Sequence, residues 1–226
     1  MDNIFEILIK FVVLLFSVII HETAHGLTAE YFGDPTARYS GRITLNPIPH
    51  IDPIGSVIVP LLAYMNNFPL FGWARPVPVN PSNLRNPFVH NTYVAAAGPA
   101  SNFLLIMIST VGWIVVLLLF KHIPFLVASG EGVLAGFNIL FSQMIIINSI
   151  LGLFNLIPVP PLDGHWILFR FLPPRMGELL AAIRPYGFFI LIILFVTPVL
   201  GMILLPPVSL IYHGAVHLVN AVVSAL

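Results

Sequence analysis

Long apolar stretches alternate with short polar connections along most of the chain. Four of them, residues 4–32, 92–120, 133–156 and 186–204, come close to the roughly 20 residues that a helix needs to cross a bilayer. The first stretch ends at Gly33, followed by Asp34 and Pro35, which is typical of a helix stop. This pattern predicts membrane-spanning helices.

Two further segments are less regular. Residues 208–226 are apolar but are interrupted by His213, His217 and Asn220, and both a fifth span and an interfacial helix fit this pattern. Residues 54–65 are shorter than a span and contain Pro60, which favours a re-entrant segment.

Residues 38–45 and 73–79, on either side of that segment, alternate in the manner of strands and are rich in turn formers. Short strands or a hairpin are expected there. The sequence thus predicts an all-α polytopic membrane protein with four to six transmembrane helices, a short re-entrant segment and a small β-strand region.

Composition agrees with this class. The chain is 58% hydrophobic and 8% charged, with a mean hydropathy of +0.97, as expected of an integral membrane protein. The net charge of zero gives no indication of nucleic-acid binding, and the lack of cysteine excludes disulfides and thiolate metal ligands. We expect a single membrane domain over residues 1–226, with a catalytic core at about 4–172 and C-terminal helices at about 183–226.

The basic residues predict the orientation. If residues 54–65 do not cross the membrane, Lys10 and Lys121 lie toward one side and every arginine lies on the other. By the positive-inside rule this places the N-terminus outside the cytoplasm. The arginines concerned are Arg38, Arg42, Arg75, Arg85, Arg170, Arg175 and Arg184.

The first apolar stretch contains the sequence His21-Glu22-Thr23-Ala24-His25. Two histidines four residues apart on a helix point to the same side and can bind one metal ion, and the glutamate between them can reach a water held by that ion. Ionisable residues within a membrane segment indicate function, so we interpret this motif as a zinc-protease site.

A third ligand is expected because catalytic zinc sites usually take three protein ligands. Asp163 follows the third span, in a stretch that prolines at 158, 160 and 161 keep from continuing as a helix. Irregular backbone at membrane depth lies in protein or lines a cavity, and the predicted topology places Asp163 on the same side as His25. A turn or helix-cap role before Gly164 is the alternative.

These motifs, together with Gly98-Pro99-Ala-Ser-Asn102 and Asn155-Leu-Ile-Pro158, resemble the site-2 protease family, in its compact prokaryotic form without PDZ or CBS domains. The resemblance implies an intramembrane zinc metalloprotease with one Zn²⁺ per chain. His21, His25 and Asp163 would be the ligands and Glu22 the general base. Asn155 would hold the substrate backbone or the developing oxyanion. A structural role, in which the Asn155 amide anchors the backbone that the prolines interrupt, fits nearly as well.

The resemblance also implies a prokaryotic cytoplasmic membrane and a transmembrane protein substrate such as an anti-sigma factor or a signal-peptide remnant. The orientation predicted from the arginines places the active site toward the cytoplasm. The rival functions are a zinc transporter and an inactive scaffold. For His213 and His217, also four apart, a packed tail helix is favoured over a metal site. For His50, a loop-packing role is favoured over an approach to the metal.

Overall fold

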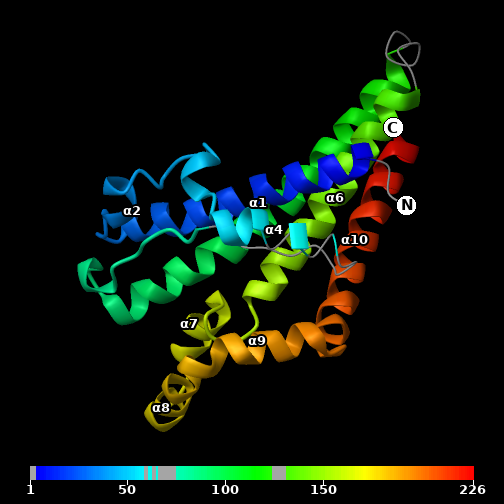
Figure 1. The fold of residues 1–226 in the computed structure, drawn as a ribbon. Coiled ribbons are helices and arrows are strands. Elements are labelled where there is room, and N and C mark those ends of the chain that lie inside the picture. The colour runs from blue at the N-terminus through cyan, green and yellow to red at the C-terminus, as the bar shows by residue number, and fades with distance from the viewer. Residues whose placement is uncertain (1–3, 59–60, 63–64, 66–74, 124–130) are drawn as a thin grey trace.

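The computed structural model describes residues 4–226 apart from 59–60, 63–64, 66–74 and 124–130. The described residues form helices joined by loops (Figure 1). In chain order these are α1 (Ile4–Tyr31), α2 (Thr36–Tyr39), η1 (Ile48–His50), the π-helix η2 (Pro53–Ile58), η3 (Pro81–Asn83), α4 (Pro87–His122), α6 (Glu131–Asn155), α7 (Asp163–Phe169), α8 (Pro174–Ile183), η4 (Arg184–Tyr186), α9 (Gly187–Val196) and α10 (Val199–Ala225).

The helices α1, α4 and α6 pack against one another and form the centre of the molecule (Figure 1). The last helix, α10, packs on α4 and α6. An apolar cluster joins these three helices through Ile106 and Trp113 of α4, Ile145 of α6, and Ala215 and Val219 of α10.

Local signals in the sequence set the ends of the long helices. After α1, Gly33 has a φ of 110°, a conformation that glycine adopts without strain, and the chain turns there. At the start of α4, the Asn86 side chain accepts a 3.3 Å hydrogen bond from the N–H of Val89, and Pro87 occupies the first helical position. These signals fix where α1 and α4 begin and end, and so which of their residues face each other.

Five segments in the described part of the chain are long and apolar enough to cross a membrane. This confirms the prediction of an all-α polytopic membrane protein. The tail, for which the sequence left two interpretations open, lies within α10 and is one of these segments. They are Ile4–Tyr31, Pro87–His122, Gly132–Asn155, Arg175–Val196 and Val199–Ala225.

The predicted span at 186–204 is wrong in its boundaries. Helix α9 ends at Val196, and α10 begins at Val199. Thr197 is extended, with φ of −95° and ψ of 158°, because the ring of Pro198 disfavours a helical conformation in the residue before it. Hydropathy continues across this break, so the apolar pattern alone does not reveal it.

The expected strands are not formed by the described residues of 38–45 and 73–79; residues 73 and 74 lie outside the described part. Arg38 belongs to α2, and residues 75–80 form neither a helix nor a strand. Pro76 and Pro78 lack an N–H, so this stretch cannot form a regular ladder of hydrogen bonds. The predicted re-entrant segment at 54–65 is described only in part: η2 covers its start, and residues 59–60 and 63–64 lie outside the described part.

One buried carboxylate joins the loop after α1 to the loop before α4. Asp34 is fully buried and accepts hydrogen bonds from the backbone N–H of Thr36 (3.1 Å), the backbone N–H of Asn80 (2.6 Å) and the amide of Asn83 (2.9 Å), as well as from the Thr36 hydroxyl. Burial alone would raise the pKa of Asp34, but these donors outweigh it and hold the pKa below its ordinary value.

We expect Asp34→Asn to lower the free energy of unfolding by about 1.5–3 kcal/mol near neutral pH, because the donors lose a charged acceptor. A carboxyl whose pKa is lowered by folding stabilises the protein above its unfolded pKa of about 3.9, and this stabilisation is lost as the pH falls through the folded pKa. The difference between wild type and variant in thermal unfolding should therefore shrink in acid. Glu178→Gln, at an exposed position on α8, is the control. A difference independent of pH would contradict the proposed charge effect.

Candidate metal centre

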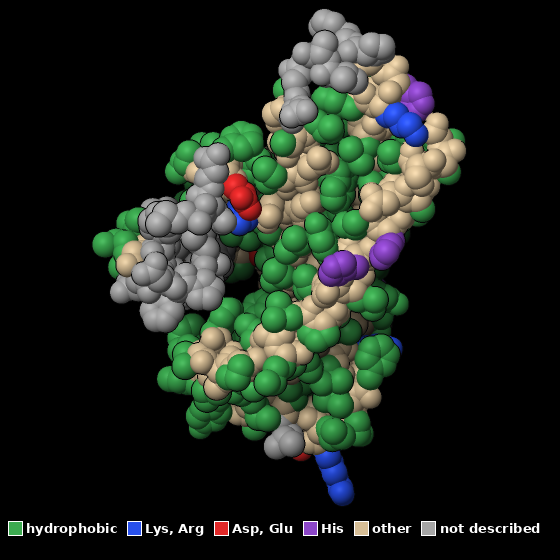
Figure 2. Space-filling model, turned by 90° about the vertical axis from the view of Figure 1, so that its right-hand side faces the viewer, with side chains coloured by type: hydrophobic (Ala, Val, Ile, Leu, Met, Phe, Trp, Pro, Cys, Tyr) green, Lys and Arg blue, Asp and Glu red, His purple; other side chains and the backbone are tan. Residues whose placement is uncertain are grey.

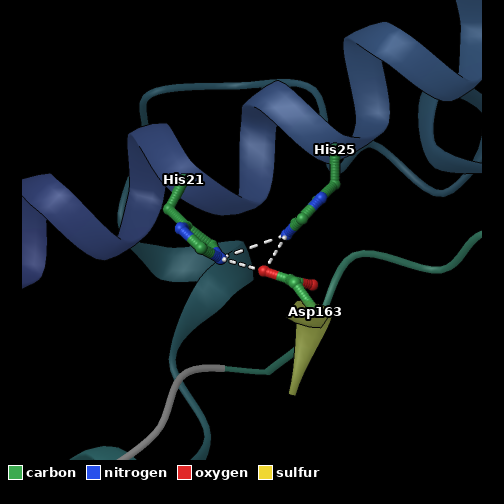
Figure 3. Close-up of side chains that lie close together, drawn as sticks. All are labelled: His21, His25 and Asp163. Carbon is green, nitrogen blue, oxygen red and sulfur yellow. Dashed lines mark hydrogen bonds and ion pairs between the residues drawn. The ribbon is translucent and has the colours of Figure 1, made fainter. Parts of the chain in front are cut away.

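Two histidines on one face of α1 form the centre of the site. Nε2 of His21 and Nε2 of His25 are 3.1 Å apart, and both face Asp163, the first residue of α7 (Figure 3). Oδ2 of Asp163 lies 3.2 Å from Nε2 of His21 and 3.3 Å from Nε2 of His25. The structure thus brings together the three residues that the sequence predicts as metal ligands, and their ligand atoms lie within 4.8 Å of one another.

The other ring nitrogens of the two histidines face hydrogen-bond acceptors. Nδ1 of His21 lies 2.7 Å from Oδ1 of Asn102, and Nδ1 of His25 lies 2.7 Å from the backbone carbonyl of Val94. A carbonyl oxygen can only accept, so each Nδ1 carries the proton. Each neutral ring therefore keeps its lone pair on Nε2, directed at Asp163.

The Asp163 carboxylate contributes a third acceptor. Its Oδ2 atom is buried and has no hydrogen-bond partner in the described part of the chain.

Three electron-rich atoms this close repel one another unless a cation lies among them. Two imidazoles and one carboxylate are ligands that catalytic zinc uses, and such sites take three protein ligands and leave a position open. The imidazole tautomers are already set by the partners of their Nδ1 atoms, as in known zinc sites. The residues present therefore fit a zinc ion.

Two glycines let neighbouring backbone approach these ligands. A Cβ on Gly98 of α4 would lie 2.5 Å from Cε1 of His21 and 2.5 Å from Nε2 of His25. A Cβ on Gly164, directly after Asp163, would lie 2.6 Å from the carbonyl oxygen of Ile157. Separations below 3.0 Å are not tolerated, so α4 and the start of α7 take up their positions only because both residues are glycine.

The loops beside α1 hold Glu22. Its Oε2 atom accepts a 2.7 Å hydrogen bond from the backbone N–H of Val77. Since Pro76 and Pro78 have no N–H, Val77 is the donor between them. The hydroxyl of the next residue, Thr23, donates to the carbonyl of Thr44 at 3.2 Å. Two loops that are distant in the sequence thus form hydrogen bonds with the same turn of α1.

Asn155, His50 and His213 form hydrogen bonds with residues outside this group. Asn155 is the last residue of α6, and its amide donates to the carbonyl of Leu151 at 3.0 Å, so its predicted role toward substrate stays a prediction. His50 is buried with Nε2 3.0 Å from the carbonyl of Thr44. His213 is exposed on α10, with Nδ1 2.7 Å from the carbonyl of Ser209, and His217 is exposed one turn further.

Sequence reasoning missed the residues that support the ligands. The Asn102 amide donates to Oδ1 of Asn148 at 2.9 Å, and the Asn148 amide donates to the hydroxyl of Ser17 at 2.9 Å. All three are fully buried. The signal was present, because each is a polar residue inside an apolar stretch and such residues need partners within the bundle. Which of them pair depends on how the helices pack, and the sequence does not give that.

Comparison with known proteins agrees with this geometry. The sequence pattern of peptidase family M50 matches residues 9–196. YwhC of Bacillus subtilis (strain 168) is 36% identical over 219 residues, which cover 95% of this chain and 92% of YwhC. Rip2 of Mycolicibacterium smegmatis and Rip2 of Mycobacterium tuberculosis are each 30% identical, over 83% of this chain, which spans 66% of their length. Each of these relatives is named "Putative zinc metalloprotease". No solved structure matches the chain.

A bundle of membrane-spanning helices that carries this site on its first helix defines the protein as a membrane-embedded zinc metalloprotease. The chain belongs to peptidase family M50, the site-2 protease family.

We expect Gly98→Ala to weaken zinc binding about 10- to 100-fold, because the added methyl group would displace the rings of His21 and His25. Zinc content and affinity of the purified protein would measure this. Gly214→Ala makes the same change in α10, where a Cβ would meet nothing within 4 Å, and should leave zinc binding unchanged. Equal zinc affinity in the two variants would show that the close approach of α4 does not matter.

Proposed function

We propose that this protein hydrolyses peptide bonds in or near the transmembrane segments of membrane proteins, as in regulated intramembrane proteolysis. His21, His25 and Asp163 are the ligands of one Zn²⁺ per chain. The observation that carries the proposal is the convergence of the two Nε2 atoms and Oδ2 of Asp163, with both Nδ1 atoms engaged elsewhere.

Glu22 acts as the general base. When bound, zinc supplies a Lewis acid that polarises the peptide carbonyl and lowers the pKa of water toward about 7. Glu22 takes the proton from the attacking water and delivers it to the leaving amine. The hydrogen bond from Val77 supports this role, because it ties Oε2 of Glu22 in one direction and leaves the other carboxylate oxygen for the proton.

Asn155 is assigned to the substrate backbone or to the oxyanion that develops during hydrolysis. Its amide N–H is directed at the carbonyl of Leu151. To serve the substrate, the side chain rotates away from that carbonyl, or it acts through its free oxygen.

We place the enzyme in a prokaryotic cytoplasmic membrane as a single domain, with its N-terminus outside and its active site toward the cytoplasm. The support is the distribution of the arginines, and the position of Asp163 beside His25 agrees with the side assigned to both. A single-span regulator such as an anti-sigma factor, or a signal-peptide remnant, fits such a site as substrate.

Two substitutions test the proposal together. We expect Glu22→Gln to keep about one zinc per chain and to lower cleavage of a membrane-protein substrate about 10²- to 10⁴-fold, because the base is lost while the ligands remain. We expect Asp163→Ala to lose most of its zinc and its activity with it. Metal analysis and a cleavage assay in vesicles measure both effects.

The outcomes separate the roles. Unchanged zinc in Asp163→Ala would remove this residue from the ligand set. Cleavage at the wild-type rate by Glu22→Gln would remove Glu22 as the base. A zinc-loaded wild type that transports zinc and cleaves nothing would favour a transporter.

A further inference from the structure

A cleft lies between the two loops that form hydrogen bonds with Glu22 and Thr23 of α1. It has a volume of about 400 Å³ and is lined by Ser40, Arg42, Arg75, Pro76 and Pro78. Two of the five described residues that line it are arginines, and no carboxylate is among these five. The cleft therefore offers hydrogen-bond donors and positive charge to whatever enters it.

Arg42 is unusual because it is buried and forms no ion pair with the described residues. Its residue surface is only 8% exposed, and its hydrogen bond within the described part of the chain is a long one, 3.5 Å from Nη1 to the carbonyl of Arg75. Burial, followed by the charge of Arg75, lowers the pKa of Arg42, and the charge of Glu22 offsets this only in part. A guanidinium has five N–H donors, so most of those on Arg42 are left for a partner in the cleft.

The walls of the cleft are fixed to the catalytic turn of α1. On one side, Thr23 donates to the carbonyl of Thr44. On the other side, Val77 donates to Glu22, and the backbone N–H of Arg75 donates to the carbonyl of His50 at 2.8 Å. A group bound between Arg42 and Arg75 therefore lies at a fixed position relative to Glu22, the proposed general base.

We infer that this cleft is a substrate subsite that binds a peptide carboxylate, from an acidic side chain or from a free C-terminus, and so selects where the chain is cut. The inference rests on the proposed protease function. A carboxylate matches the fork of a guanidinium and forms charge-assisted hydrogen bonds with it. A peptide is favoured over a lipid phosphate because the segment 75–78 that lines the cleft is the same segment that contacts Glu22.

The test uses synthetic transmembrane peptides that differ only in the position of one glutamate, each paired with its glutamine counterpart, in phosphatidylcholine vesicles. We expect kcat/KM to be about tenfold higher for glutamate at one position on one side of the cut, with no such effect elsewhere. A second pair of peptides, with a free or an amidated C-terminus, separates the two sources of the carboxylate.

Variants of the exposed arginine avoid disturbing the fold. Arg75→Gln should abolish the preference for glutamate, and Arg75→Glu should replace it with a preference for lysine at the same position. Arg175→Gln, exposed on α8 and outside the cleft, should behave as wild type. Arg42→Gln should abolish the preference as well and should retain its zinc.

Several results would overturn the inference. One is cleavage with no charge preference at any position. Another is an equal loss for glutamate and glutamine peptides in Arg42→Gln and Arg75→Gln, which would mean that the arginines act only on Glu22. A third is a rate that depends on added phosphatidylglycerol and not on the peptide, which would assign the cleft to a lipid phosphate.

If the proposed protease function is wrong, the zinc-loaded wild type cleaves none of the peptides. Binding of the paired glutamate and glutamine peptides to the zinc-loaded Glu22→Gln protein then still decides whether the cleft recognises a carboxylate: equal affinities would overturn the inference, and about tenfold tighter binding of the glutamate peptide would support it.

Discussion

The 2.7 Å hydrogen bond between His21 and Asn102 connects the proposed metal ligands to the interior of the helix bundle. From Asn102 the chain of hydrogen bonds continues to Asn148 on α6 and returns to α1 at Ser17, one turn before His21. The three central helices are thus joined by a closed ring of polar contacts. In lipid, an unpaired buried amide costs several kcal/mol, so the same bonds that orient the imidazole also disfavour any sliding of one helix past another.

Much of this structure follows from the sequence alone. Helix lengths, the His21 and His25 pair on one face, and the need for a third ligand are all local properties. Counting membrane crossings placed Asp163 on the side of His25, a count that takes residues 54–65 as not crossing the membrane. The break at Thr197 shows the limit of the method: hydropathy measures transfer into lipid, whereas the break comes from the steric effect of Pro198 on the residue before it. The described residues of the strand expected at 73–79 form no strand for a related reason, because prolines favour extended backbone but remove the donors that pair strands.

The support of the site could not be predicted from local properties. Asn102 and Asn148 are 46 residues apart, and their pairing depends on the rotation of α4 and α6 about their axes. The carbonyl of Val94 and the N–H of Val77 belong to the backbone, and no side-chain pattern marks them as partners of His25 and Glu22. Gly98 belongs to a recognisable motif, but only the packed helices show that its missing Cβ makes room for both imidazoles.

Histidines on the surface of the bundle and histidines at the site differ in their hydrogen-bond partners. Most of the face in Figure 2 is apolar, as lipid requires, and histidine side chains are exposed in its middle. His213 and His217 lie on the exposed side of α10. His213 satisfies Nδ1 with the carbonyl of its own helix, as serines and threonines of the bundle also do. His21 and His25 instead use Nδ1 to reach a different helix, and this frees both Nε2 atoms to face the same point. The same i, i+4 spacing thus has different consequences on α1 and α10. What supports the assignment of the first pair to a metal site is the set of acceptors that α4 presents to it, together with a carboxylate from α7.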